Sequence, residues 1–136
     1  MLYRVWEKHT LCEVYQGDCR EVIAENRIEW RNAFDMIFAD PPFNIGQDYD
    51  SHNDEMSEGE FELFILETLG VCAEVLRVGG IFVVHVPDEM VHLPLISLPC
   101  LGFERIDWII WHYRFGQCQD SKFIRSKNHA LVFRKG

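Results

Sequence analysis

The sequence has no long hydrophobic run, no closely spaced pair of cysteines and little positive charge. None of its apolar stretches is long enough to cross a bilayer, and its first residues lack the apolar core of a signal peptide. The five cysteines are odd in number and widely spaced, with no Cys-x-x-Cys pair. We therefore expect no membrane segment and no disulfide framework, and a reducing cytoplasm fits. The six histidines show no ligand spacing, so we expect no metal site.

Acidic residues outnumber basic ones by 22 to 13, which gives a formal net charge of −9. Such a charge argues against a general nucleic-acid coat protein. The basic residues are unevenly placed, however, because the segment from Arg114 onward contains only one acid, Asp120. This segment either faces phosphate groups or is an ordinary solvated basic tail. Its basic residues are Arg114, Lys122, Arg125, Lys127, Arg134 and Lys135.

Strands and helices are expected to alternate along a single domain. Apolar residues make up 48% of the 136 residues, which is enough for one core. The run from Phe34 to Ala39 is almost continuously apolar, as in strands buried on both faces of a parallel sheet. The order predicts an α/β sheet with helices on both faces. The other expected elements are strands over 11–16, 81–86, 104–112 and 129–134, a helix over 20–27 and an irregular or weakly helical segment over 88–101.

Local signals mark the ends of the longest expected helix. Ser57 followed by Glu60 predicts a capped helix start. Gly79-Gly80 is expected to end that helix before the next strand. Further along, Pro94 and Pro99 are expected to break any regular helix.

The motif Asp40-Pro41-Pro42-Phe43 follows the strand over 34–39 directly. A stiff Pro-Pro pair flanked by a carboxylate and an aromatic ring can grip a planar group that carries an amino function. An enzyme acting on the amino group of a nucleobase needs such a grip. The simpler interpretation is that Asp-Pro-Pro only ends the strand.

Polar residues follow several of the expected strands. In α/β sheets, ligands bind at the carboxyl ends of the strands. Asp18, the motif over 40–43, and the segments over 85–88 and 111–115 all lie at such positions. We therefore expect these strand ends to meet at one edge of the sheet.

With these motifs in this order, the chain resembles the amino-group DNA methyltransferases, in the permuted arrangement called the beta class. The resemblance extends over nearly the whole chain. It implies an α/β fold with a Rossmann-like methyltransferase sheet, mostly parallel with a last antiparallel strand. The matching segments are 15–19 at the first strand end, 34–46 around the motif, 75–80 at the next turn, and 108–113 and 126–133 in the last two strands.

The resemblance also implies a substrate, a cofactor and a partner. Asp40 and the carbonyl of Pro41 would hold the amino group of a base in DNA, with S-adenosylmethionine as the methyl donor and Asp40 near that cofactor. Phe43 would stack on the base, which must first leave the duplex. Family members whose motif begins with Asp generally act on adenine, whereas those with Ser more often act on cytosine. We therefore expect adenine as the target.

Other residues receive weaker assignments. Asp18 is expected either to contact the cofactor or to cap the helix that follows it. His85 is interpreted as a hydrogen-bonded strand histidine, and Trp108 and Trp111 as core residues. The residues expected to contact the target base or DNA are Asn44, which would also shape the catalytic loop, Tyr113, Phe115, Arg114, Lys122, Arg125 and Lys127.

The chain also departs from the family pattern. It has no Gly-rich strand-to-helix turn for the cofactor, and two strands that the family places between the Leu11 and Phe34 strands are missing. We therefore interpret residues 1–136 as one partial catalytic domain, without the target-recognition region, that needs a further segment or partner chain. Alternatively, the Leu11 strand pairs directly with the Phe34 strand in a remodelled sheet.

Other functions remain open at this stage. The chain could be an inactive methyltransferase-like subunit that supports a partner, although an intact Asp-Pro-Pro-Phe motif argues against this. It could also methylate the amino group of cytosine, or act on RNA or on a protein glutamine. Enzymes of the latter two kinds usually carry Asn in place of Asp40.

Overall fold

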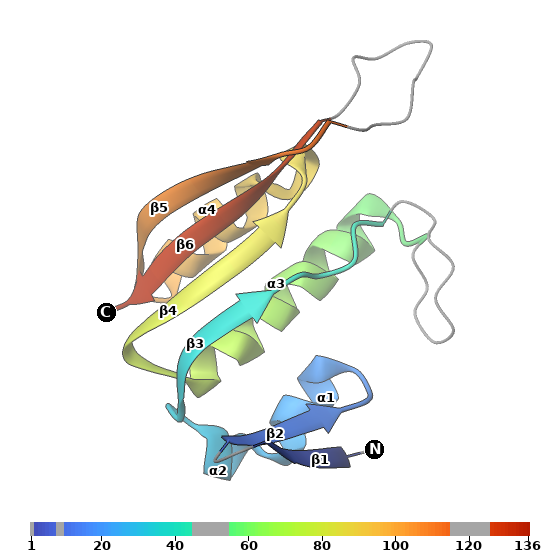
Figure 1. The fold of residues 1–136 in the computed structure, drawn as a ribbon. Helices are drawn as coiled ribbons and strands as arrows, with labels where there is room; N and C mark the ends of the chain where they lie inside the picture. Colours follow the sequence, from blue (N-terminus) through green and yellow to red (C-terminus); the bar gives the residue numbers. More distant parts are fainter. Residues whose placement is uncertain (1, 8–9, 45–54, 115–125) are drawn as a thin grey trace.

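A four-stranded sheet forms the centre of the computed structural model, which describes residues 2–7, 10–44, 55–114 and 126–136 (Figure 1). The strand order is β3-β4-β6-β5. The strands are β3 (Phe34–Ala39), β4 (Leu76–Val86), β5 (Phe103–His112) and β6 (Lys127–Lys135). Strands β3 and β4 are parallel, and β6 runs antiparallel to both β4 and β5. Three strands therefore share one direction and the last strand opposes them, which confirms the expected sheet.

Two helices cover one face of this sheet. They are α3 (Glu58–Val75) and α4 (His92–Cys100), and their apolar residues form one core with the strands. Ile65 and Leu69 of α3 are buried together with Phe82 of β4 and Phe133 of β6. The predicted start of α3 is confirmed, because Ser57 and Glu60 form a reciprocal capping box.

The expected helix end at Gly79-Gly80 is wrong. Helix α3 ends at Val75, and both glycines lie inside β4. Leu76 already pairs with Phe34, and the register then shifts before Met36 pairs with Ile81. Gly79 has a φ of +74°, and a Cβ on Gly80 would lie 2.8 Å from the carbonyl oxygen of Arg77. The glycines therefore serve this irregularity in β4 and do not terminate the helix.

The expected irregular segment over 88–101 is in fact mostly helical. It contains a short 3₁₀ turn, η1 (Asp88–Met90), and helix α4. Pro94 lies in the first turn of α4, where a backbone N–H would have no helical partner, and Pro99 lies next to its last residue. Neither proline therefore interrupts the middle of the helix.

The N-terminal region forms a separate hairpin of β1 (Leu2–Glu7) and β2 (Thr10–Tyr15). β2 confirms the expected strand, whereas β1 was not expected. β2 does not pair with β3, so the proposed remodelled sheet is wrong. Two short helices, α1 (Cys19–Glu25) and α2 (Arg27–Trp30), lead to β3. Trp30 packs edge-to-face on both Tyr15 and Phe34, which connects the hairpin to β3.

The second face of the main sheet carries exposed apolar side chains. We call it the open face, and it includes Met36 and Phe38 of β3 and Ile109 and Trp111 of β5. Met36 is 55% and Phe38 61% exposed. The expectation that β3 is buried on both faces, with helices on each, is wrong, because β3 is an edge strand and α3 and α4 lie on one face only. No helix within the described residues is long and apolar enough to span a membrane.

Candidate active site

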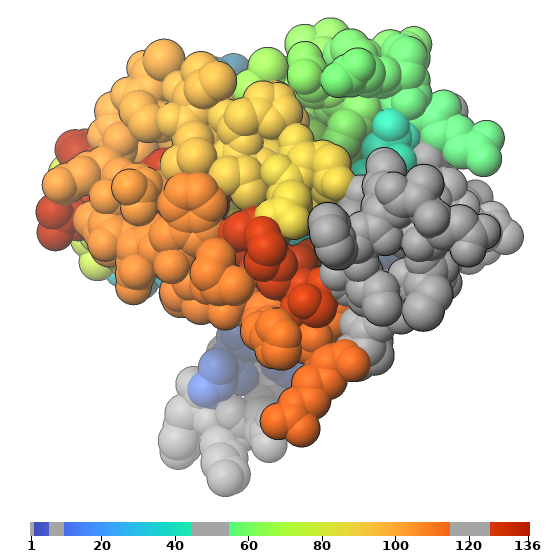
Figure 2. All heavy atoms as spheres, turned by 90° about the horizontal axis from the view of Figure 1, so that it is seen from above, coloured from blue at the N-terminus to red at the C-terminus, as the bar shows by residue number. Residues whose placement is uncertain are grey.

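The carboxyl ends of β3, β4 and β5 meet at one edge of the sheet. Asp40 follows β3, Pro87 and Asp88 follow β4, and Tyr113 follows β5. Figure 2 looks onto this end, where the start of β6 (red) lies beside the residues after β4 (yellow) and the end of β5 (orange). The Tyr113 backbone N–H donates a hydrogen bond to the Ser126 carbonyl at 2.8 Å. The expected meeting of strand ends is thus found for these three strands.

Asp40 is hydrogen-bonded to a buried histidine that sequence reasoning did not connect to it. The Nδ1 atom of His85 lies 2.8 Å from Oδ1 of Asp40. A carboxylate accepts only, so this geometry assigns the ring proton to Nδ1. His85 Nε2 is buried and has no hydrogen-bond partner within the described residues. Only one of the two ring nitrogens is therefore hydrogen-bonded, so the expectation of a fully hydrogen-bonded strand histidine is half right. A buried nitrogen left unpaired, such as Nε2, costs about 1–3 kcal/mol.

Aromatic rings surround this pair. The Phe43 ring centroid lies 5.8 Å from that of His85, and the Trp111 centroid lies 5.4 Å from it on another side. Trp111 is 59% exposed, and Trp108 is also exposed, so the expectation that they are core residues is wrong. A cleft of about 580 Å³ opens beside Phe43 and is also lined by Asn44, Pro87 and Tyr113. Such a cleft is large enough for a planar heterocycle.

Asn44, the residue after the motif, is held to Met56 by two hydrogen bonds. Its side-chain Nδ2 donates to the Met56 carbonyl at 2.9 Å, and its Oδ1 accepts from the Met56 N–H at 2.8 Å. The backbone φ of Asn44 is +54°, a left-handed conformation that asparagine tolerates better than most residues. Asn44 therefore joins the end of the motif to the residue before the Ser57 cap, and its expected role in shaping the catalytic loop stays a prediction, because residues 45–54 lie outside the described residues.

A second polar cluster holds the strand ends together. Asp88 Oδ1 lies 2.5 Å from Lys127 Nζ and 2.5 Å from His129 Nε2. Trp108 Nε1 donates to His129 Nδ1 at 2.9 Å, so Nδ1 is the acceptor and Nε2 carries the proton donated to Asp88. The hydrogen bonds from Lys127 and His129 lower the pKa of Asp88 below its ordinary value. This cluster connects the residue after β4 to both β5 and β6.

Replacing Asp88 with asparagine is expected to weaken folding mainly above the ordinary carboxyl pKa of 3.8. Because the folded-state pKa is lowered, the charge of Asp88 stabilises the fold above the unfolded-state value. That contribution is lost as pH falls through the lower folded-state pKa. We expect a difference in unfolding free energy of at most about 1 kcal/mol near pH 7, since the carboxylate is half-exposed.

Urea unfolding of wild type and Asp88→Asn, near neutral pH and near pH 3, measures this difference. The advantage of wild type should be smaller in the acidic series. An equal difference in both series would contradict the assigned role of the charge.

The basic residues near the C-terminus do not form one surface. Lys127 lies at the candidate site and bonds to Asp88. Because β6 runs antiparallel to β4, Arg134 and Lys135 lie at the opposite end of the sheet. There Arg134 pairs with Glu104, and Lys135 donates to the carbonyls of Ala73 and Leu76. Arg114 is exposed after β5, whereas Phe115, Lys122 and Arg125 lie outside the described residues.

Asp18 does not lie with the other strand ends, because β2 belongs to the hairpin. Its carboxylate accepts a hydrogen bond from the backbone N–H of Arg20 at 2.8 Å. Asp18 therefore caps α1, which confirms the helix-capping alternative. The same carboxylate pairs with the Arg20 side chain, which also reaches Glu67 of α3. The cofactor role of Asp18 stays a hypothesis.

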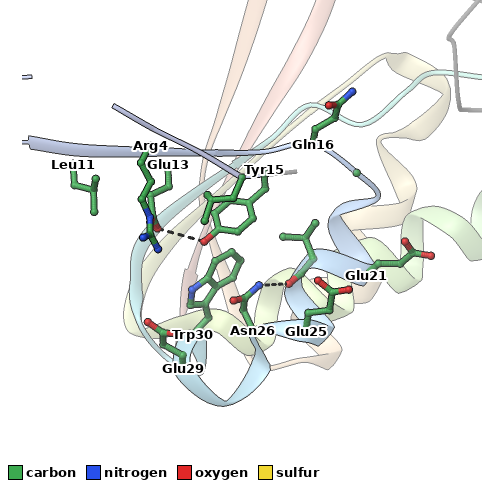
Figure 3. Close-up of a pocket in the computed structure, with 13 residues that line it drawn as sticks. Arg4, Leu11, Glu13, Tyr15, Gln16, Glu21, Glu25, Asn26, Glu29 and Trp30 are labelled. Atoms are coloured by element: carbon green, nitrogen blue, oxygen red, sulfur yellow. Dashed lines mark hydrogen bonds and ion pairs between the residues drawn. The ribbon is translucent and has the colours of Figure 1, made fainter. Parts of the chain in front are cut away.

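A larger hollow of about 820 Å³ lies between the hairpin and the first two helices (Figure 3). Figure 3 shows Arg4 beside Glu13, with which it forms an ion pair, and Tyr15 above Trp30. Glu21, Glu25 and Glu29 also line it. This acidic lining disfavours phosphate groups, so we do not place nucleic acid there.

The described cysteines are free thiols. Cys72 is buried, and burial raises its pKa to about 12, which keeps it protonated and unreactive. Burial also raises the pKa of the Cys19 thiol, with the charge of Asp18 as a smaller cause. Within the described residues no three potential ligands gather around a common metal position.

Curated relatives of the chain are bacterial DNA methyltransferases. It is 29% identical over 110 residues to the DNA adenine methyltransferase YhdJ of Escherichia coli (strain K12), an alignment that covers 80% of this chain and 35% of YhdJ. It is also 29% identical over 128 residues to the type II methyltransferase M.BamHI of Bacillus amyloliquefaciens, covering 93% of this chain and 29% of that protein. The chain thus spans about a third of the length of the curated relatives it matches.

Solved structures show the same fold. A complex of M1.HpyAVI with SAM matches with a TM-score of 0.64 and 20% identity, covering 89% of this chain and 53% of the other. The cytosine-N4-specific PvuII DNA methyltransferase matches with a TM-score of 0.66 and 13% identity, covering 90% of this chain and 48% of the other. The described sheet is therefore an incomplete Rossmann-like α/β fold. Residues 34–136 match a family described as DNA methylase, and the chain belongs to that family.

Proposed function

We propose that residues 1–136 form a partial catalytic domain that transfers a methyl group from S-adenosylmethionine to the exocyclic amino group of adenine in DNA. The observation that supports this most is the position of Asp40-Pro41-Pro42-Phe43. The motif follows an edge strand at the meeting point of three strand ends, and its last residue, Phe43, lines a cleft. The similarity to the adenine methyltransferase YhdJ supports adenine as the base.

Asp40 and Pro41 hold the amino group in this proposal. Oδ1 of Asp40 is occupied by His85, which leaves Oδ2 to accept one amino proton. The Pro41 carbonyl accepts the other, and its rotation is limited because the ring fixes φ of Pro41 and the following Pro42 restricts its ψ. The nitrogen lone pair of adenine is delocalised into the ring, so two acceptors that favour a tetrahedral nitrogen make it a better nucleophile. The chain thus contributes positioning and electrostatics.

Phe43 supplies the surface on which the base stacks. Its ring is half-buried. One side packs against the core and fixes the ring, and the other side lines the cleft. Tyr113 lines the same cleft from the end of β5. Taking a base out of the duplex costs a few kcal/mol, and stacking of about 1–3 kcal/mol offsets much of this cost.

The residues present fit only one end of S-adenosylmethionine. When bound, this cofactor supplies an electrophilic methyl group. Asp40 is 60% exposed and follows β3, an edge strand within the described residues, which supports a position near that methyl. No Gly-x-Gly occurs in the sequence, so a close backbone cradle for the remainder of the cofactor is not provided by these residues.

A completing segment therefore binds the open face and the edge of β3 in this proposal. The unpaired edge offers backbone groups to a further strand, and Met36 and Phe38 offer apolar area to its covering helices. The relatives are about three times as long as the matched region, so their further length is sufficient for such a segment. The segment would carry the glycine-rich turn and the residues that recognise the DNA sequence.

The test is methylation of DNA by the domain assembled with its completing segment. We expect radiolabel from S-adenosylmethionine in DNA, and N6-methyladenine as the product after digestion to nucleosides and mass spectrometry. N4-methylcytosine would overturn the assignment of the base. Label in RNA or protein, and none in DNA, would overturn the proposed function itself.

A further inference from the structure

We propose that His85 is a positioning residue that orients the Asp40 carboxylate for the amino group of the target base. This inference rests on the proposed function and deepens it. Ala39 of β3 pairs with Val84 of the parallel strand β4. Asp40 directly follows Ala39 and His85 directly follows Val84, so the two residues lie side by side. The register therefore brings a buried donor to the side chain that is expected to grip the substrate.

Asp40 needs such a partner because, in the part of the chain that the structure describes, little else restrains it. It is the first residue after an edge strand, and its side chain is largely exposed. His85, in contrast, lies within β4 and only 8% of its side chain is exposed. The 2.8 Å bond from Nδ1 fixes Oδ1 and leaves Oδ2 directed elsewhere. A rigid donor thus selects one carboxylate rotamer before the base arrives.

The ring of His85 is itself fixed by its surroundings. Phe43, from the segment after β3, and Trp111 of β5 pack on it, while Nε2 has no hydrogen-bond partner within the described part of the chain. An apolar residue would fill this place without leaving a buried nitrogen unpaired. The hydrogen bond to Asp40 therefore explains why a histidine occupies this position. Its contact with Phe43 means that one side chain holds both the carboxylate and the stacking ring.

Three substitutions separate positioning from space-filling. His85→Asn retains a donor near the position of Nδ1, His85→Gln moves its amide toward the position of Nε2, and His85→Leu retains volume without a donor. In the assembled enzyme, Asn should keep kcat within about threefold of wild type. Leu and Gln should lower kcat about 10- to 100-fold, with affinities for S-adenosylmethionine and DNA unchanged. Thermal unfolding confirms that each variant is folded.

A double-mutant cycle tests whether His85 acts through Asp40. If it does, His85→Leu should cost little further activity in an Asp40→Ala background. Independent of activity, ¹⁵N NMR of the histidine rings in the 136-residue chain should show the His85 proton on Nδ1. That tautomer preference should weaken in Asp40→Ala.

The outcomes are distinguishable. A folded His85→Leu enzyme with wild-type kcat would overturn the role of His85, as would an Asn variant as impaired as Leu or a proton found on Nε2. A wild-type enzyme that transfers no methyl group to DNA would instead overturn the proposed function. In that case the NMR result still decides whether the two side chains are paired.

Discussion

Asp40→Ala is expected to reduce methyl transfer to adenine about 100- to 1,000-fold while leaving the affinity for S-adenosylmethionine within a few-fold. The substitution removes the acceptor that holds the amino group in the transition state, and loss of one such positioned group costs about 2–4 kcal/mol of barrier. Radiolabelled methyl transfer measures the rate, and calorimetry on the assembled enzyme measures cofactor binding.

Asp35→Ala provides a matched control. Asp35 lies in β3, the strand that Asp40 follows, and its side chain is strongly exposed. It pairs with Arg77 at the opposite end of β3 from the candidate site. We expect its removal to change the rate less than twofold, since exposed ion pairs contribute little to stability. Near-full activity of Asp40→Ala, or an equal loss in both variants, would show that the site is wrongly placed.

The 136 residues by themselves are expected to be inactive and to bind S-adenosylmethionine poorly. Among the described residues the outer edge of β3 has no partner strand and the open face is apolar, and the sequence provides no glycine-rich cradle. The isolated chain should also self-associate through this face, because exposed edge strands and large apolar patches promote pairing between chains. Light scattering and calorimetry of the purified chain test both expectations.

Phe38→Lys is a useful companion variant for this experiment. It places a charge on the open face without touching the core, and it should shift the chain toward monomers while leaving its thermal unfolding nearly unchanged. A wild-type chain that is a monodisperse monomer and binds the cofactor at micromolar affinity would refute the need for a completing segment.

Features set by neighbouring residues in the sequence could be predicted well. The apolar run over 34–39 gave β3 with its bounds, and the Ser57–Glu60 spacing gave the start of α3. The Asp40 motif was visible because its chemistry lies in consecutive residues. Positions that depend on local propensity and capping are therefore readable from a single sequence.

Features set by pairing between distant segments could not be predicted. Gly79-Gly80 look like a helix end, but the pairing of Leu76 with Phe34 makes them part of a strand. The exposure of Phe38 follows from the edge position of β3, which no local pattern reveals. The link between His85 and Asp40 depends on the register of two strands separated by a long helix. One signal was available, since both residues lie near the ends of predicted parallel strands.

The paired hydrogen bonds between Asn44 and Met56 indicate where this chain tolerates additional sequence. They join the two ends of the intervening stretch, so the sheet and the start of α3 are anchored whatever that stretch contains. Lengthening a closed loop is cheap, at about 0.6 kcal/mol for each doubling. We therefore expect sequence inserted between these two residues to leave the sheet and the start of α3 intact.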